Sequence, residues 1–331
     1  MSKKNTRPSL VDKVLEVIDL KTYFFTRSGV VKAVDGVSFH VGQGETLGLV
    51  GESGSGKSIS CLSILRLVPQ PAGKIVGGQI LLNGEELLKK HPAEMRKVRG
   101  AEISMILQDP MTSLNPVFTI GDQVAEPIQI HQKMDRKRAW EKAKEMLGLV
   151  KIPMPEIRVR EYPHQMSGGM RQRIVGAMAL SCRPKLLIAD EPTTALDVTI
   201  QAQFLELLKS IQRQFQLALI VVTHDFGIVA KVCDRVAVMY AGQIVETGPI
   251  REIFSRPRHP YTAALLNSLP KLDKRVPRLP SIPGQPPDLG NLPPGCAFAP
   301  RCSKVMPVCK KEAPSERQLT ADHSLRCWLA G

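Results

Sequence analysis

Long hydrophobic runs are missing from this sequence of 331 residues. Its longest uninterrupted aliphatic run, LALIVV at residues 217–222, is far shorter than the roughly 20 apolar residues that a membrane-spanning helix needs. That run suits a buried strand. The basic N-terminal stretch is not followed by an apolar segment, so we expect no secretory signal. These absences argue against an integral membrane protein and a secreted one, and we expect the chain to stay in the cytosol.

Negative charge is also scarce, since 31 acidic residues face 45 basic ones and give a net charge of +14. A basic balance of this kind fits nucleic acid, an anionic membrane surface or nucleotide phosphates as partners, and it fits a merely solvated basic face equally well. Residues 256–331 hold 12 Lys/Arg, 5 Asp/Glu and 13 of the 26 prolines. This shift in composition predicts one domain over residues 1–255 and a Pro-rich extension over 256–331.

Closely spaced cysteine pairs of the C-x2-C type, typical of structural zinc, are absent as well. Three cysteines are isolated and read as small buried hydrophobes: Cys61, Cys182 and Cys233. The other four cluster at the end with C-x5-C-x6-C-x17-C spacing: Cys296, Cys302, Cys309 and Cys327. In the cytosol such a cluster is more often a metal site than a set of disulfides.

The wide gaps in this cluster leave room for loops to wrap a [4Fe–4S] cluster, which takes four cysteines. Zinc is the alternative metal, and disulfides or free thiols remain open. We expect a metal to staple the Pro-rich segment, which has little capacity for a core of its own, in preference to a redox-sensing role. His323, four residues before Cys327, is a possible substitute ligand, but a surface histidine is the preferred interpretation.

Residues 47–58, LGLVGESGSGKS, form a phosphate-binding loop in its required context. A strand-like apolar run enters the glycine-rich turn, and a predicted helix, ISCLSILRLV, follows it. Backbone amides and the helix N-terminus attract phosphate, while Lys57 is expected to bridge the β- and γ-phosphates and Ser58 to ligate Mg²⁺. The loop and the residue after it supply the candidate nucleotide contacts: Gly51, Ser53, Gly54, Ser55, Gly56, Lys57, Ser58 and Ile59.

A second apolar strand, in LLIADE at residues 186–191, ends in two carboxylates. At the end of a strand beside the phosphate loop, Asp190 is placed to hold Mg²⁺ through water. Glu191 is then placed to polarise an attacking water. Helix capping is the simpler alternative for such residues.

Six short motifs occur in one order along the chain: GESGSGKS at 51–58, ILQDP around Gln108, SGGMRQR at 167–173, LLIADEP at 186–192, ALD at 195–197 and VVTHD around His224. Together they resemble the nucleotide-binding subunit of ABC transporters over roughly residues 12–255. The visible departure is Met166 where leucine is commonest, and the two side chains have similar volumes. The resemblance implies an α/β P-loop ATPase of ABC type, with an antiparallel β subdomain and a helical subdomain at about residues 110–170. A small irregular cysteine-rich C-terminal extension would follow it.

The resemblance also implies roles for individual residues. Glu191 would be the general base, His224 would contact the γ-phosphate, and Gln108 would contact Mg²⁺ and the attacking water. Phe24 would stack on adenine, with Tyr23 and Phe25 as rivals. Strand alternation places Phe24 on the face of Leu20 and Thr22, and we favour it for that reason.

The same resemblance implies that the protein works as a dimer. Ser167, Gly168 and Gly169 would reach the γ-phosphate of ATP bound to a second subunit, and Asp197 would lie at the seam. A hydroxyl and bare amides at a helix N-terminus suit an anion. Residues 126–165 are predicted to form a helical insertion, and residues 111–128 would line the groove that receives a helix of a transmembrane subunit.

A second resemblance covers most of residues 256–331. HPYT at 259–262, SIPGQPPDL at 281–289 and CAFAPRC at 296–302 resemble the C-terminal extension of the oligopeptide/dipeptide importer family. HPYTAALL is expected to start a short helix. The implied protein is a peripheral ATPase at the cytoplasmic face of the membrane that binds ATP and Mg²⁺.

The partners that this resemblance implies are a second ATPase subunit, either a paralogue or a second copy, two transmembrane permease subunits, and an extracytoplasmic substrate-binding protein. No nucleic acid is expected. The alternatives are an importer ATPase for another small solute such as nickel, or a soluble ABC ATPase acting on nucleic acid or ribosomes.

Overall fold

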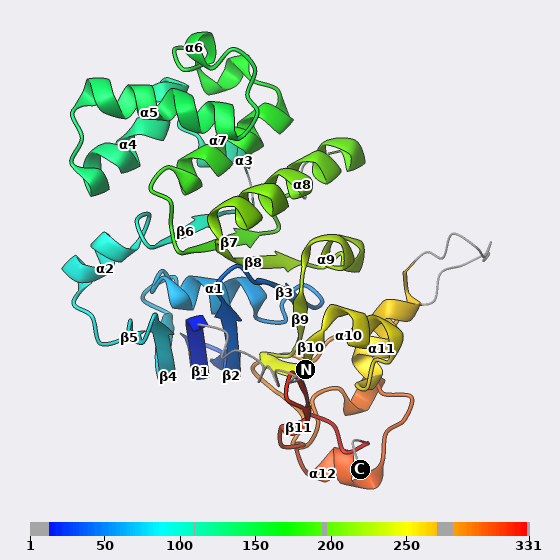
Figure 1. Cartoon of the computed structure of the whole chain (residues 1–331). Helices are drawn as coiled ribbons and strands as arrows, with labels where there is room; N and C mark the ends of the chain where they lie inside the picture. The colour runs from blue at the N-terminus through cyan, green and yellow to red at the C-terminus, as the bar shows by residue number, and fades with distance from the viewer. Residues whose placement is uncertain (1–12, 109, 194–196, 270–280, 330–331) are drawn as a thin grey trace, which may run out of the picture.

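The computed structural model describes residues 13–108, 110–193, 197–269 and 281–329 (Figure 1). It has two sheets and a layer of helices beside the larger sheet, which confirms the predicted α/β fold with an antiparallel β subdomain and a helical subdomain. An irregular C-terminal segment follows. The basic N-terminal stretch lies mostly outside the described residues, as do residues 195 and 196 of the ALD motif and part of the Pro-rich stretch.

The larger sheet has eight strands in the order β11-β12-β10-β9-β3-β8-β7-β6. Five consecutive strands, from β9 to β6 at one edge, are parallel neighbours and nearly all apolar, as expected for strands covered on both faces. They are β3 (Thr46–Val50), β6 (Ile103–Ile106), β7 (Leu186–Asp190), β8 (Ala218–Thr223) and β9 (Arg235–Tyr240). Because these strands run in one direction, the residues that follow them gather at one edge of the sheet.

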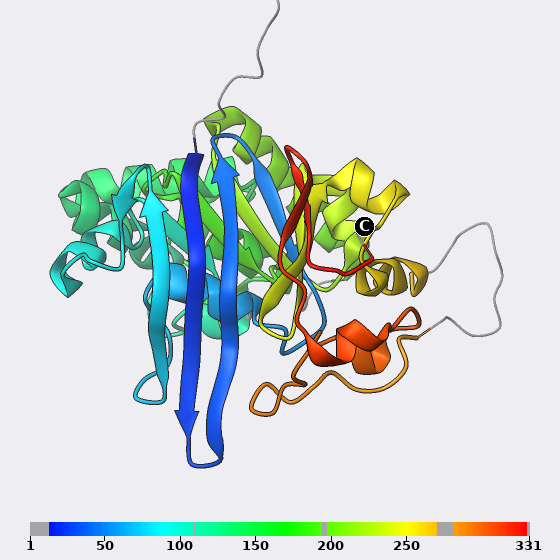
Figure 2. The ribbon, with the colours of Figure 1, turned by 90° about the horizontal axis from the view of Figure 1, so that it is seen from below.

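The smaller sheet is antiparallel and has the order β2-β1-β4-β5. Figure 2 shows its three long strands side by side across one face of the molecule. The strands are β1 (Lys13–Thr26), β2 (Gly29–Gly42), β4 (Gly73–Leu82) and β5 (Glu85–Glu86). Buried side chains of this sheet, such as Leu20 and Val37, join a hydrophobic core with α1 and the larger sheet.

The first helix, α1 (Lys57–Ile64), starts within the phosphate loop and is shorter than the predicted helix. The chain turns at Arg66, whose φ of 53° is left-handed and ends the helical path. The other helices within residues 92–255 are α2 (Pro92–Val98), α3 (Pro110–Ser113), α4 (Ile120–Gln132), α5 (Arg136–Leu149), α6 (Pro155–Arg158), η1 (Pro163–Gln165), α7 (Gly168–Leu180), α8 (Val198–Phe215), α9 (Phe226–Val232) and α10 (Ile250–Ser255).

The predicted insertion at residues 126–165 is helical, and it lies at the top of Figure 1. Its helices begin after polar caps, since Thr119 accepts from the backbone of Asp122 and Asp135 from that of Arg138. Apolar side chains on α4, α5 and α7 pack together in one core with the larger sheet.

The C-terminal extension is built onto the main sheet. Strand β10 (Gln243–Pro249) pairs with β9 on one side and with β12 (His323–Leu325) on the other, and β11 (Arg317–Thr320) adds the edge. Figure 2 shows this terminal hairpin, in red, beside the antiparallel sheet. The remaining elements of the extension are α11 (Pro260–Asn267), η2 (Ala299–Arg301) and α12 (Pro307–Lys311).

Two aromatic residues of this extension, Tyr261 and Phe298, belong to the same buried core as the helices and the larger sheet. The extension is therefore stabilised by packing against the core of the main domain. This agrees with its composition, which predicts little capacity to form a hydrophobic core of its own. The proposed boundary near residue 255 remains a prediction.

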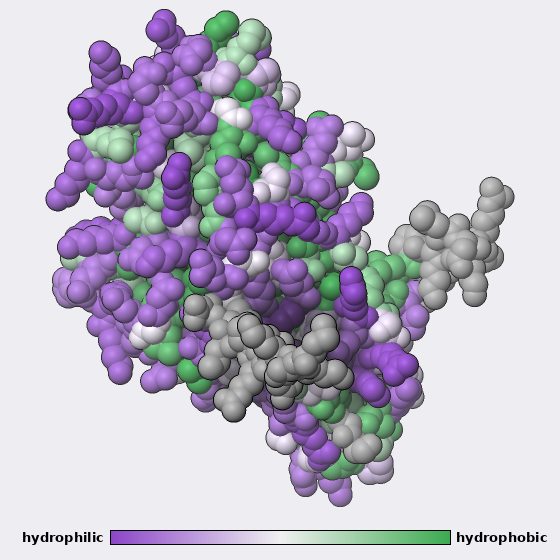
Figure 3. All heavy atoms as spheres, in the orientation of Figure 1, coloured by the Kyte–Doolittle hydropathy of each residue, from purple (hydrophilic) through white to green (hydrophobic). Residues whose placement is uncertain are grey.

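Helices of the described residues do not combine the length and apolar character that crossing a membrane requires. Polar and charged residues cover most of the face drawn in Figure 3, with small apolar areas among them.

Candidate nucleotide site and cysteine cluster

The phosphate loop joins β3 to α1 and needs glycine at two close approaches. Gly51 has a φ of 153°, and a Cβ there would lie 2.2 Å from the carbonyl oxygen of Met239. Gly56 has a φ of 105°, and its Cβ would lie 2.3 Å from the carbonyl oxygen of Ala33. Both a left-handed backbone and lack of space therefore fix glycine here.

Lys57 is buried and its ammonium group lies inside the loop. Its Nζ donates to the carbonyl oxygens of Gly51 at 2.8 Å and Glu52 at 2.9 Å. Burial lowers the pKa of Lys57, and the carboxylates of Glu191, Asp190 and Glu52 act against that shift. The amine therefore lies among acidic groups and is hydrogen-bonded to backbone carbonyls. When a nucleotide binds, phosphate oxygens would replace these carbonyls as its partners.

Ser58 and Asp190 meet as their positions predict. The hydroxyl of Ser58 donates to Oδ1 of Asp190 at 3.1 Å. Burial raises the pKa of Asp190, the Ser58 hydrogen bond lowers it, and the charge of Glu191 raises it further. Burial disfavours the negative charge of Asp190, and a bound cation would offset that cost. The carboxylate and the Ser58 hydroxyl are oxygen ligands of the kind that the hard cation Mg²⁺ takes.

Glu191 contacts the other two residues that are expected to be catalytic, Gln108 and His224. Nε2 of Gln108 donates to its Oε2 at 2.9 Å, and Nδ1 of His224 lies 3.2 Å from its Oε1. The three residues follow the adjacent strands β6, β7 and β8, and this adjacency brings them together. Glu191 also has a left-handed φ of 43°, a strain found more often at functional sites.

The SGG motif lies at the start of α7 and faces outward. The hydroxyl of Ser167 accepts from the backbone N–H of Met170, so it caps the helix. Ser167 and Gly168 are exposed, and a Cβ on Gly168 would meet nothing within 4 Å. Asp197 is likewise an N-cap, here for α8, since it accepts from the backbone of Thr199 and Ile200. Their role toward a second subunit remains a prediction.

The three adjacent aromatics of β1 differ in surroundings. Tyr23 donates its hydroxyl to Asp35 at 2.6 Å. Burial, together with this hydrogen bond, raises the pKa of Tyr23 to about 12. Phe25 is 46% exposed, with the ammonium of Lys74 above its ring. Phe24 is half-buried and lies over Gly73. Stacking of Phe24 on adenine remains a prediction.

The four terminal cysteines line one small cavity beside His259 and Phe298, and all seven cysteines of the chain are free thiols. Backbone N–H groups point at two of the sulfurs, from Lys304 to Cys302 and from Leu329 to Cys327, each at 3.4 Å. Burial raises the pKa values of three members of the set, Cys296, Cys302 and Cys327. Over the described ranges, histidine, cysteine and acidic side chains do not form a group of three or more suited to a single metal ion.

His323 corrects the expectation of a surface histidine. It is 3% exposed and lies between two carboxylates, with Nε2 3.0 Å from Glu246 and Nδ1 3.2 Å from Glu252. It takes this place because β12 pairs with β10, which carries Glu246.

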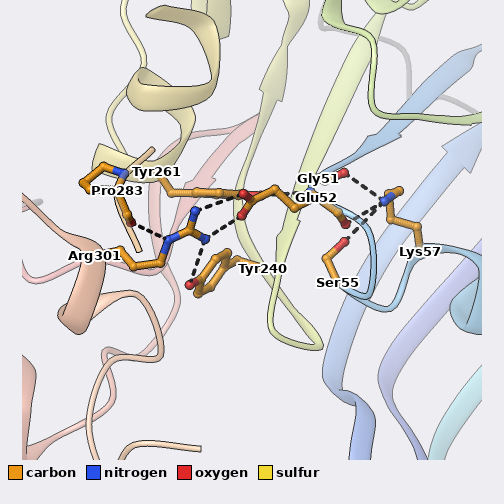
Figure 4. Close-up of polar contacts among 8 residues, drawn as sticks. All are labelled: Gly51, Glu52, Ser55, Lys57, Tyr240, Tyr261, Pro283 and Arg301. Atoms are coloured by element: carbon orange, nitrogen blue, oxygen red, sulfur yellow. Dashed lines mark hydrogen bonds and ion pairs between the residues drawn. The ribbon is translucent and has the colours of Figure 1, made fainter. Parts of the chain in front are cut away.

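Sequence reasoning missed three residues that join the extension to the phosphate loop. Glu52 of the loop pairs with Arg301, and its backbone N–H donates to the hydroxyl of Tyr261 (Figure 4). Tyr261 and Arg301 both stand inside the quoted motifs HPYT and CAFAPRC. An arginine in an apolar motif, and an acidic residue in a phosphate-binding loop, were the available signals.

A phosphate loop after β3, a serine–aspartate pair and a glutamate at the ends of neighbouring parallel strands define a P-loop ATPase of the ABC type. The ABC transporter family model matches residues 34–194, and the model of the oligopeptide/dipeptide transporter C-terminal region matches residues 245–309.

Among curated proteins, the dipeptide transport ATP-binding protein DppD of Bacillus subtilis is 53% identical over 96% of this chain and 95% of its own. The oligopeptide transport ATP-binding protein OppD of the same organism is 53% identical over 96% of this chain and 89% of its own. The solved post-hydrolysis dimer of the ATP-binding cassette MJ0796 with ADP and Pi covers 72% of this chain and 99% of its own at a TM-score of 0.64 and 25% identity.

The chain therefore belongs to the family of ABC transporter ATP-binding proteins of the oligopeptide/dipeptide type. As an ABC ATPase it couples ATP hydrolysis to transport, and it requires ATP and Mg²⁺, ATPase dimerisation and transmembrane permease partners.

Proposed function

We propose that the chain powers the import of dipeptides or oligopeptides from the cytoplasmic face of the membrane. The two relatives named above are dipeptide and oligopeptide transport proteins, and the C-terminal region specific to that branch matches here. The observation that carries the enzymatic part is the contact of Gln108 and His224 with Glu191. Two permease subunits, a second ATPase subunit and an extracytoplasmic substrate-binding protein complete the proposed importer.

The chemistry follows from these placements. Lys57 and the loop amides hold the phosphates, and Asp190 and Ser58 would hold Mg²⁺, which would neutralise charge on the phosphate oxygens. Glu191 takes a proton from the attacking water, while His224 and Gln108 orient the reacting groups. The exposed Ser167 and Gly168 complete the site of a second subunit, so that ATP binding closes a dimer and hydrolysis releases it.

An exposed apolar pair marks the proposed permease groove. Val117 is 72% exposed and Phe118 is 52% exposed, both within the segment predicted to receive a transmembrane partner's helix. Apolar side chains this exposed gain from burial in an interface.

Val117→Glu is therefore expected to weaken assembly with permease-containing membranes by about tenfold, since it places a charge in a desolvated contact. Co-sedimentation with such membranes measures this. Val76→Glu, at a 45% exposed position in β4, is the matched control. Equal binding of the two variants would contradict the placement of the groove.

We further propose that Cys296, Cys302, Cys309 and Cys327 hold a [4Fe–4S] cluster. All four line one cavity, all are free thiols, and two receive backbone N–H···S hydrogen bonds. Four cysteine thiolates are the ligand set that a [4Fe–4S] cluster takes. The cluster would cross-link the Pro-rich segment, with zinc as the alternative.

Anaerobically purified protein is therefore expected to contain about four iron and four acid-labile sulfide per chain. Cys309→Ser is expected to lose most of both and to make the extension more sensitive to proteases, whereas Cys182→Ser, outside the cavity, is expected to keep them. One zinc per chain without sulfide would overturn the choice of metal.

Nickel and other small solutes are the alternatives to a peptide cargo. The ATPase does not contact the cargo, so its own residues do not select among them. Binding assays on the partner substrate-binding protein distinguish these cargoes.

The net charge of +14 also admits a nucleic-acid partner. Co-purification with membranes that resists RNase supports the importer, and co-purification with ribosomes contradicts it.

A further inference from the structure

The C-terminal extension holds the phosphate loop through one ion pair with two hydrogen bonds. Nη1 of Arg301 lies 2.6 Å from Oε2 of Glu52, and Nη2 lies 3.0 Å from Oε1 (Figure 4). The two residues are 249 positions apart in the chain. A bidentate arginine–carboxylate pair fixes both the position and the orientation of the carboxylate.

Arg301 is itself held rigidly. Its side chain is 4% exposed, its Nε donates to the carbonyl oxygen of Pro283 at 3.0 Å, and its Nη1 lies 3.4 Å from the hydroxyl of Tyr240. The short helix η2 that ends at Arg301 lies between Cys296 and Cys302. The fold of the cysteine-bearing segment therefore positions the guanidinium of Arg301 against the phosphate loop.

Tyr261 adds a second attachment, this time to the backbone. Its hydroxyl accepts from the N–H of Glu52 at 2.9 Å. Its ring packs against Tyr240 and Phe298, with centroids 4.6 and 5.3 Å apart. The side chain and the amide of one loop residue are thus both held by the extension.

The charge of Glu52 matters because it is close to the phosphate-binding lysine. The Glu52 carbonyl oxygen accepts from Nζ of Lys57, and the carboxylate is among the groups whose field acts on that amine. An unpaired carboxylate in the phosphate loop would repel a triphosphate, and the half-buried side chain of Glu52 is only partly screened by water. Arg301 neutralises this charge.

We propose that Arg301 and Tyr261 are positioning residues of the ATP site, through which the C-terminal extension sets the affinity for ATP. Arg301 cancels the charge of Glu52 and orients its side chain, and Tyr261 fixes its amide. The extension is thereby part of the nucleotide site, although every motif of the ATPase lies before it in the chain.

The test is the Kd of the full chain for Mg–ATP, measured by titration calorimetry at low salt. Arg301→Met is expected to raise the Kd about tenfold, because it leaves a carboxylate unpaired beside the phosphates. Adding Glu52→Gln is expected to bring the Kd back to within about threefold of the parent, because the repelling charge is gone. Raising the salt concentration is expected to narrow the gap between Arg301→Met and the parent.

Arg326→Met is the matched control, since Arg326 is a half-buried arginine of the same extension that pairs with Glu316 and Gly36. Its Kd is expected to equal that of the parent. An unchanged Kd in Arg301→Met, or a double variant that binds as weakly as Arg301→Met, overturns the proposal, the latter by showing a purely structural role.

If Arg301→Met does not fold, Tyr261→Phe tests whether the extension sets the affinity for ATP. It removes only the hydroxyl and keeps the ring packing, so its Kd is expected to rise about fivefold with a retained cooperative unfolding transition. A Kd equal to that of the parent in this variant overturns the proposal.

Discussion

Replacing Glu191 with glutamine is expected to lower ATP turnover by about 10²–10⁴-fold while ATP still binds. Glutamine has nearly the shape of glutamate and can still contact Gln108 and His224, but its neutral amide cannot accept a proton from water. Loss of the negative charge beside the phosphates also favours bound ATP. The variant should therefore accumulate as an ATP-bound dimer.

Phosphate release and size-exclusion chromatography with and without Mg–ATP measure the two effects of this change. Glu206→Gln, at an exposed position on α8, is the control and should hydrolyse ATP at the parent rate. Hydrolysis at the parent rate in Glu191→Gln would refute the assignment of the general base.

Replacing Lys57 with methionine is expected to weaken ATP binding by about 100-fold or more, because the ammonium makes charge-assisted hydrogen bonds to phosphate oxygens. Methionine preserves the length and the apolar part of this buried side chain, so the fold should survive. Titration calorimetry with Mg–ATP measures the loss, and circular dichroism verifies the fold.

Lys185→Met is the control for this second change, since Lys185 pairs with Glu102 at the surface, away from the loop. If Lys57→Met bound ATP as tightly as this control does, the lysine would have no role in phosphate binding.

The placement of the three proposed catalytic residues at one edge of the sheet follows from local patterns. Gln108, Glu191 and His224 each come directly after an apolar run or within two residues of it, and parallel strands put such residues at one edge of a sheet. The phosphate loop was predictable for the same reason, since its glycines, lysine and serine are contiguous.

The long-range features were not predictable from these patterns. The pairing of β12 with β10, the burial of His323 and the ion pair between Arg301 and Glu52 all join segments more than 70 residues apart. Each depends on how the extension packs, and the composition of that segment indicated only that it would be irregular. The choice among Tyr23, Phe24 and Phe25 depends on a ligand, and neither strand alternation nor burial decides it.

The proposed function requires that ATP hydrolysis by this chain drives peptide import. The most direct test reconstitutes the chain with its two permease subunits in vesicles and adds the substrate-binding protein loaded with a labelled dipeptide or oligopeptide. Peptide-loaded binding protein is expected to raise ATP hydrolysis, and labelled peptide is expected to accumulate inside the vesicles, with both effects lost in Glu191→Gln. ATP hydrolysis that proceeds without any accumulation of peptide would contradict it.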